Sequence, residues 1–476
     1  MVEPSLKKRT FHGVIWKIVE TGGTQFIQLV VSIFLARLVM PNQFSAIAML
    51  SIFLALARVF VDSGFSSALM RKPNRTQTDC CTVFYSNIII SVITYIILFF
   101  CAPLVADFYE LPELIILLRV MALCIIIGAF SAVQKTLFTV EMNFKALAYY
   151  NMAALVISGC VGIYMAYKGF QVWALVAQSI LNTTINTIFV WYKSTWRPSI
   201  LFSTKSLKEF FKFGSKLLSS QLLNTFFNNI YGVVIGKIFA RPDLAFYNRA
   251  QVLNNMTSTT PTYVIAGVSY PAFCKMQEDN DRLREGYRKM IIICSFIIFP
   301  LSLGIGGVSF PLINVLYTEA WIYAATLLQI IVFAGMWYPI HAINVNFLLV
   351  KGRSDIVLRI EVIKKVVAVL IMCITIPLGL EAMCAGGIVS SLISLFINTH
   401  YTGKFLGMGI MQQAKDFGPY LILSFVMFLG CKTCSTIMGN GIDSLVISIL
   451  LGIIIYLGGA IIFKLKGLKL LLTLRK

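Results

Sequence analysis

Long apolar segments recur along the whole chain, and short polar connections separate each segment from the next. A helix that crosses a bilayer needs about 20 mostly apolar residues, because the hydrocarbon layer is about 30 Å thick. By this criterion the pattern predicts about fourteen transmembrane helices. They are expected to begin near residues 11, 44, 80, 114, 147, 171, 214, 246, 287, 321, 359, 381, 417 and 443. The sequence therefore predicts an all-α integral membrane protein.

The first and the seventh of these segments share one pattern of glycine, basic and proline positions. Gly13–Pro41 and Gly214–Pro242 have the same length, and a basic residue (Arg37, Lys237) stands about one turn before each Pro. Two long helices of similar composition would also give this pattern. We favour a duplicated core of two six-helix lobes with a substrate path between them. The expected domains are an N-terminal lobe (1–192), a cytoplasmic amphipathic linker (193–213), a second lobe (214–403), and two further helices with a basic tail (404–476).

Composition and charge agree with a protein that crosses the membrane many times. Of the 476 residues, 58% are hydrophobic and only 13% are charged, and a soluble protein of this length cannot bury so much apolar surface. The N-terminal segment, alternate connections and the tail hold 32 of the 40 Lys and Arg residues. Because basic residues stay in cytoplasmic loops, we expect both termini in the cytoplasm and an even number of spans. The net charge of +20 therefore reflects topology, and no nucleic-acid partner is expected.

The sequence carries no signature of catalysis or of a bound cofactor. The three His residues lack metal-ligand spacing, no phosphate-binding P-loop sequence occurs, and the predicted outer loops are short. The eleven Cys residues are odd in number and lie mostly in apolar segments, so they indicate no disulfide framework. We expect neither an enzyme nor a metal or cofactor site.

Polar side chains form stripes on the first two predicted helices. A charge at mid-membrane costs roughly 2.5–3.5 kcal/mol, so it normally faces protein or a wet cavity. In the first helix Glu20 and Gln28 share one side, with Gln25 alongside. In the second helix Arg58 and Asp62 are four residues apart and can partly neutralise each other. These residues are candidates for a site inside the membrane.

Further stripes of amide residues, three or four positions apart, lie on the sixth, seventh and eighth helices. They comprise Gln178, Asn182 and Asn186; then Asn224 and Asn228; then Asn248, Gln251 and Asn255, with Arg249 beside the last set. Hydrogen bonding between helices is the simpler explanation of any one stripe. Their concentration on the first two helices of each predicted lobe instead favours a hydrophilic cavity.

Four sequence motifs carry a family resemblance. The motifs are Leu35–Pro41 followed by Phe44, Phe60–Leu69, Phe246–Ala250 and Tyr270–Lys275. They resemble the oligosaccharide-lipid flippases of the MOP exporter superfamily, above all the Wzx-type polysaccharide exporters. The likeness extends over nearly the whole chain in the number, order and connections of the helices. Ser45 and Ala245 stand where that family usually has glycine, and both are small enough to keep the fold.

The resemblance implies a flippase that moves a polyprenyl-pyrophosphate-linked oligosaccharide to the outer leaflet of a bacterial inner membrane, in lipopolysaccharide, capsule or O-antigen biosynthesis. Such a headgroup needs cations for phosphate and amides for sugars. The phosphate candidates are Arg37, Arg58, Lys237 and Arg249, and the sugar candidates are Gln25, Gln28, Asn224, Asn228, Asn248, Gln251 and Asn255. Glu20 and Asp62 are candidates for coupling to H⁺ or Na⁺.

Two other functions fit parts of the sequence. A cation-coupled small-molecule or multidrug exporter of the same superfamily needs an acidic coupling site but little basic lining. A membrane polysaccharide polymerase would place its chemistry in the outer loops. The basic residues in and near the spans favour an anionic lipid headgroup as cargo. Partner polymerases or glycosyltransferases would meet the protein at its cytoplasmic loops.

Overall fold

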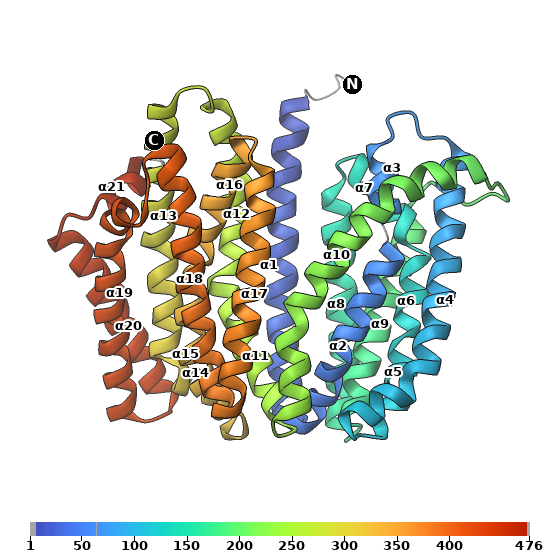
Figure 1. Ribbon diagram of the computed structural model, residues 1–476. Coiled ribbons are helices and arrows are strands. Elements are labelled where there is room, and N and C mark those ends of the chain that lie inside the picture. Colours follow the sequence, from blue (N-terminus) through green and yellow to red (C-terminus); the bar gives the residue numbers. More distant parts are fainter. Residues whose placement is uncertain (1–5, 63, 474–476) are drawn as a thin grey trace. The chain divides into compact units, whose positions relative to one another are not determined.

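The computed structural model describes residues 6–62 and 64–473, and every regular element in these ranges is a helix. The chain forms two compact units, one up to Ala245 and the other from Phe246 on. Figure 1 shows that each unit is a bundle of long helices. The predicted all-α fold is confirmed.

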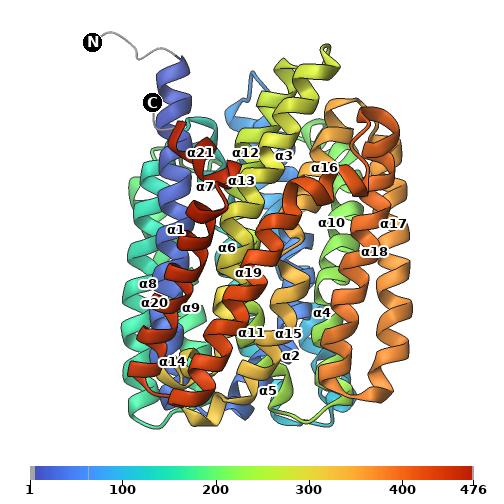
Figure 2. The same cartoon turned by 90° about the vertical axis from the view of Figure 1, so that its left-hand side faces the viewer.

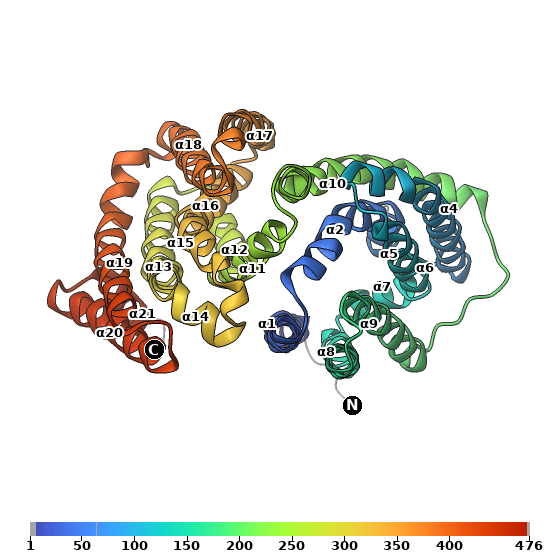
Figure 3. The same ribbon diagram turned by 90° about the horizontal axis from the view of Figure 1, so that it is seen from below.

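The first unit contains ten helices within the described residues. They are α1 (Leu6–Leu38), α2 (Pro41–Asp62), α3 (Phe65–Arg71), α4 (Gln77–Tyr109), α5 (Glu113–Met121), α6 (Leu123–Ala129), α7 (Ala132–Val140), α8 (Phe144–Tyr167), α9 (Val172–Lys193) and α10 (Thr204–Ile238). Helix α8 packs between α1 and α9, and α10 packs along α2. Figure 3 shows α1, α8 and α9 nearly end-on.

The second unit follows from α11, which begins just before the boundary. Its elements are α11 (Asp243–Thr257), α12 (Thr259–Lys275), α13 (Asn280–Gly307), α14 (Ser309–Leu316), η1 (Glu319–Trp321), α15 (Tyr323–Gly335), α16 (Tyr338–Val350), α17 (Ser354–Thr375), η2 (Ile376–Leu378), α18 (Leu380–Leu406), α19 (Ile410–Met438), α20 (Ile442–Ile462) and α21 (Lys466–Thr473). Helix α19 packs against both α13 and α20, as Figure 2 shows.

Ten helical segments within 6–62 and 64–473 are long and apolar enough to cross a membrane. An eleventh is added if α5–α6 and α7, which meet at a 45° bend, form one broken span. The other predicted spans fall on α10, on the pair α11–α12 and on α17. These segments are less apolar, because α10 carries several amides and α17 several charges. Each predicted start therefore lies on a helix or within two residues of one.

The predicted linker 193–213 contains an irregular segment and the beginning of a long helix. The chain after α9 is irregular up to Ser203, whose side-chain oxygen caps α10 by accepting from the Ser206 amide. Helix α10 then runs unbroken from Thr204 to Ile238. The amphipathic segment is thus the beginning of the seventh predicted span. The structure groups all of α10 with the first unit, whereas the sequence-based boundary assigns residues from 214 to the second lobe.

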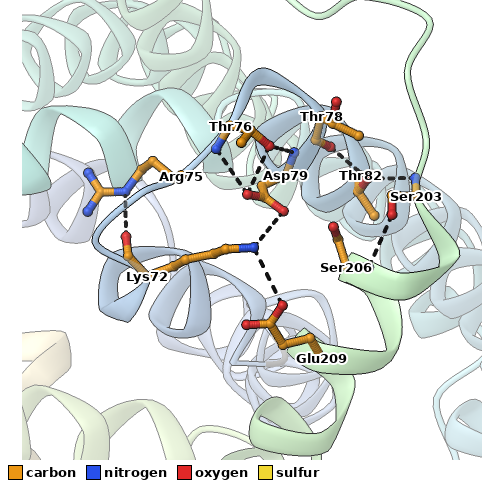
Figure 4. Close-up of polar contacts among 9 residues, drawn as sticks. All are labelled: Lys72, Arg75, Thr76, Thr78, Asp79, Thr82, Ser203, Ser206 and Glu209. Carbon is orange, nitrogen blue, oxygen red and sulfur yellow. Dashed lines mark hydrogen bonds and ion pairs between the residues drawn. The ribbon is translucent and has the colours of Figure 1, made fainter.

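An ion-pair network fixes the beginning of α10 to the beginning of α4 (Figure 4). The Lys72 ammonium lies 3.0 Å from the Asp79 carboxylate and 3.5 Å from the Glu209 carboxylate. Asp79 also accepts from the backbone N–H of Thr76, in the capping box that begins α4. The hydrogen bond to Asp79 raises the pKa of Lys72. We call Lys72, Asp79 and Glu209 the α4–α10 clamp.

The basic connections of the first unit gather at one end of its bundle. Gln77 donates to the backbone oxygen of Arg197 at 2.8 Å, which joins the first residue of α4 to the connection after α9. At the same end of the helices, the Lys145 ammonium lies 5.4 Å from the ring centroid of Trp16 in α1. This arrangement agrees with the charge alternation from which the topology is predicted.

Candidate functional site

A polar cavity of about 570 Å³ lies within the first unit. Side chains from α1, α2, α6, α7, α8 and α9 line it, and most of them are polar or charged. The same helices are largely apolar elsewhere, since they include candidate membrane spans. Polar groups inside a membrane segment are costly and usually mark a site. We take this cavity, called the unit-1 cavity below, as the candidate functional site.

A chain of hydrogen bonds crosses one wall of the unit-1 cavity. Glu20 of α1 is only 8% exposed, and its Oε1 accepts from Asn151 Nδ2 of α8 at 2.7 Å. The Oδ1 of Asn151 in turn accepts from Asn186 Nδ2 of α9 at 2.5 Å. The three helices are therefore linked through one buried carboxylate and two amides. A change in the charge of Glu20 alters the first link of this chain.

Two cationic side chains stand in the same cavity. Arg58 comes from α2 and Lys135 from α7, whereas Glu20 is the one carboxylate among the described lining residues. The lining therefore carries an excess of positive charge. A guanidinium can bind two phosphate oxygens at once, and an ammonium adds a point charge. Such a lining suits the anionic headgroup of a larger ligand.

Among the predicted site residues of the first unit, the structure brings Glu20, Gln28 and Arg58 together in the cavity. Gln25 lies on α1 but is not part of the cavity lining. Asp62 ends α2, and its side chain falls outside the part of the structure that is described.

Two predicted basic residues lie at the other end of the first unit. Arg37 is exposed in the last turn of α1. Lys237 is paired with Glu110 at 2.7 Å, and its ammonium lies 5.5 Å from the Phe108 ring centroid. The hydrogen bond from Lys237 lowers the pKa of Glu110. A role in phosphate binding stays a prediction for both basic residues.

The predicted site residues of α10 and α11 do not line the unit-1 cavity. Asn224 and Asn228 are exposed on α10. The Arg249 guanidinium lies 5.4 Å from the ring centroid of Trp321, a cation–π contact inside the second unit. The remaining candidates there are Asn248, Gln251 and Asn255, of which Gln251 donates to Asn255 at 3.1 Å. Their contact with sugars also stays a prediction.

Sequence reasoning missed two cavity residues as members of the site. Lys135 counts as part of a basic connection in the sequence, yet it stands on α7 and faces the cavity. Asn151 is a lone amide in an apolar segment, and nothing in its neighbours singles it out. For α9, the third helix of the hydrogen-bond chain, the sequence gives a clearer signal. Its amides Gln178, Asn182 and Asn186 recur every four residues, and all three line the cavity.

Comparison with known proteins gives the family. Residues 34–326 match the family model described as polysaccharide biosynthesis protein, and this is more than half of the chain. The chain therefore belongs to the polysaccharide biosynthesis protein family. It is 27% identical over 358 residues to teichuronic acid biosynthesis protein TuaB of Bacillus subtilis, covering 74% of each chain. It is 23% identical over 366 residues to lipopolysaccharide biosynthesis protein WzxC of Escherichia coli, covering 76% of this chain and 74% of the relative.

A solved structure shares the fold. Lipid II flippase MurJ, in an inward closed conformation, superposes with a TM-score of 0.77 at 14% identity, over 94% of this chain and 98% of that one. The low identity limits this likeness to the fold. Together with the family match, it confirms the family resemblance that the sequence motifs predict.

Proposed function

We propose that this protein is a flippase that moves a pyrophosphate-linked oligosaccharide lipid from the cytoplasmic to the periplasmic leaflet of a bacterial inner membrane. The family and the relative named for lipopolysaccharide biosynthesis support a role in polysaccharide synthesis. The fold shared with a lipid II flippase supports movement of a lipid-linked saccharide. On this proposal the protein acts as a transporter and not as an enzyme.

The observation that carries the proposal is the cationic, amide-rich lining of the unit-1 cavity. Arg58 and Lys135 provide charge for a pyrophosphate, and amides such as Gln28 and Asn182 can pair with sugar hydroxyls. The volume of about 570 Å³ falls in the usual range of ligand pockets, roughly 300–1,000 Å³. It suits a headgroup with its first sugars, while the polyprenyl chain stays in the bilayer.

Glu20 is the proposed coupling group. As a carboxylate it accepts the hydrogen bond from Asn151, so an H⁺ or Na⁺ that reaches Glu20 weakens the link between α1 and α8. A bound ion shifts the balance between two conformations only if its affinities for them differ, and we propose that an ion at the buried Glu20 carboxylate acts in this way. The termini are proposed to be cytoplasmic, on the side of the basic connections.

The test uses cells that lack this protein and measures lipid-linked saccharide by leaflet accessibility. We expect build-up confined to the cytoplasmic leaflet, relieved by the wild-type gene and by Arg58→Lys more than by Arg58→Ala. Arg282→Ala removes an arginine that is 79% exposed in the second unit and serves as the matched control. It should relieve the build-up like wild type.

Each alternative predicts a different result in the same assay. No build-up together with normal surface glycan would favour a small-molecule exporter, to be followed by uptake assays under ion gradients. Build-up of an already translocated lipid in the outer leaflet would favour a polymerase. Full relief by Arg58→Ala at normal expression would remove the unit-1 cavity from the proposal.

A further inference from the structure

A second hollow lies on the surface of the first unit, between α4 and the first turns of α10. Its volume is about 740 Å³. Its walls are mainly apolar, with Ile89 and Ile90 from α4 facing Phe211 from α10. Two lysines of α10, Lys208 and Lys212, are also part of its lining. We call this hollow the α4–α10 groove.

The first turns of α10 have two distinct faces. Phe210, which is 2% exposed within an apolar cluster, marks the inner face, and Glu209 beside it pairs with Lys72 while its side chain stays 60% exposed. On the outer face, Lys208 and Lys212 are four residues apart and therefore lie on the same side of the helix. Neither ammonium has an ion-pair or hydrogen-bond partner in the described ranges. The inner face anchors the helix, and the outer face is left open.

The groove joins a charged rim to an apolar wall on a candidate membrane span. Its rim is at the end of the unit where the basic connections gather, because the α4–α10 clamp holds α10 there (Figure 4). Ile89 is 53% exposed and lies about 18 Å along α4 from Gln77, at 1.5 Å per residue. Phe211 is 59% exposed on the opposite wall. Both walls therefore expose apolar side chains beside the lysines, and α4 is long and apolar enough to cross a membrane.

We propose that the α4–α10 groove binds an anionic glycerophospholipid, with its phosphate between Lys208 and Lys212 and an acyl chain along the apolar wall. A free phosphate would leave the apolar wall uncovered, and a neutral lipid would leave the lysines without a partner. An amphiphile with one anionic end satisfies both, because lysine stems lie along apolar surface while their ammonium groups reach the headgroup. This site is separate from the unit-1 cavity, so it does not depend on the proposed function.

Binding is tested on the purified full-length protein by native mass spectrometry, with phosphatidylglycerol and phosphatidylcholine titrated separately. The groove variant is Lys208→Gln/Lys212→Gln. The control is Lys193→Gln/Lys205→Gln, which removes the same charge from exposed positions at the same end of the unit. We expect phosphatidylglycerol to bind the groove variant at least about fivefold more weakly than the control, because one lysine near an anionic lipid contributes roughly that factor. Phosphatidylcholine should bind weakly to all forms.

Two further measurements test whether the lysine charges cause the binding and where the lipid binds. Lys208→Arg/Lys212→Arg keeps both charges and should keep the affinity, which separates lost charge from lost folding. A photoactivatable phosphatidylglycerol should label peptides that contain residues 86–90 or 202–215. Equal affinity in the groove variant and the control, equal binding of the two lipids, displacement by excess inorganic phosphate, or labelling elsewhere would each overturn the proposal.

Discussion

The amide nitrogen of Asn151 donates a 2.7 Å hydrogen bond to the carboxylate of Glu20, and this contact joins α8 to α1 beside the unit-1 cavity. Asn186 extends the chain to α9. Polar contacts between helices in a membrane are worth about 0.6 kcal/mol on average and up to about 1.7 kcal/mol. Two such contacts in series therefore contribute only a small energy to the packing of α1, α8 and α9 around the cavity.

Replacing Asn151 by Leu should destabilise the protein by about 1–2 kcal/mol. Glu20 loses a donor and Asn186 loses an acceptor, so two buried polar groups are left without that partner. The change is measured as a lower midpoint of thermal unfolding in detergent. Asn182→Leu is the control, because Asn182 lines the same cavity without a hydrogen bond to any described residue. Equal shifts in the two variants would show that the chain contributes nothing.

Replacing Glu20 by Gln should remove the ion coupling that we propose, with little effect on folding. The side-chain oxygen of Gln can still accept from Asn151, but the residue no longer carries a negative charge or takes up a proton. We expect export of the lipid-linked saccharide to lose its response to a protonophore or to sodium-free medium. Glu319→Gln, at a carboxylate in η1 outside the cavity, should behave like wild type. A Glu20→Gln protein that still responds as wild type does would assign coupling to another group.

The membrane helices and part of the cavity follow from the sequence by one physical argument. Apolar runs of spanning length have to be helices in a bilayer, since no water satisfies their backbone groups. A charge within such a run is costly unless it faces protein or water, so Arg58 and Glu20 already stand out in the sequence. The structure places both in the cavity.

The rest of the site depends on geometry that hydropathy does not encode. Lys135 follows the 45° bend between α5–α6 and α7, and its sequence neighbours mark it only as part of a basic connection. Arg37 and Lys237 occupy matching places in the two repeated segments, yet neither lines the unit-1 cavity. Spacing along one helix thus predicts a shared face, but it does not predict which neighbouring helix that face meets.

Replacing Lys72 by Met should destabilise the first unit by about 1–3 kcal/mol, because it leaves the carboxylate of Asp79, which is 2% exposed, without its cation. The effect is measured by thermal unfolding. Lys205→Met, an exposed position in the first turn of α10 outside the clamp, should have little effect. If both variants unfold at the wild-type temperature, the clamp does not stabilise the fold.

The same pair predicts a pH dependence. The hydrogen bond to Asp79 raises the pKa of Lys72 in the folded state. Its stabilisation is therefore complete below the unfolded pKa of about 10.4 and is lost as the pH rises through the higher folded value. The difference in unfolding temperature between wild type and Lys72→Met should be the same at about pH 6 and about pH 9 and should shrink only above about pH 10.5. If the difference in unfolding temperature already shrinks between about pH 6 and about pH 9, this ion pair is not its cause.

Replacing Gly64 by Ala should lower the stability of the first unit by about 2–4 kcal/mol. Gly64 precedes α3 with φ +71°, a left-handed conformation that costs a residue with a Cβ about 1 kcal/mol or more. The added Cβ would also lie 2.7 Å from the Cα of Gly214 in α10. That neighbouring atom belongs to the backbone, so no flexible side chain can move aside, and α3 and α10 have to separate.

Gly22→Ala is the control, since a Cβ at Gly22 meets nothing within 4 Å and alanine favours a helix interior by about 1 kcal/mol. The midpoint temperature of unfolding should therefore fall for Gly64→Ala and stay the same or rise for Gly22→Ala. A shift in the same direction for both variants would refute a close approach of α3 and α10.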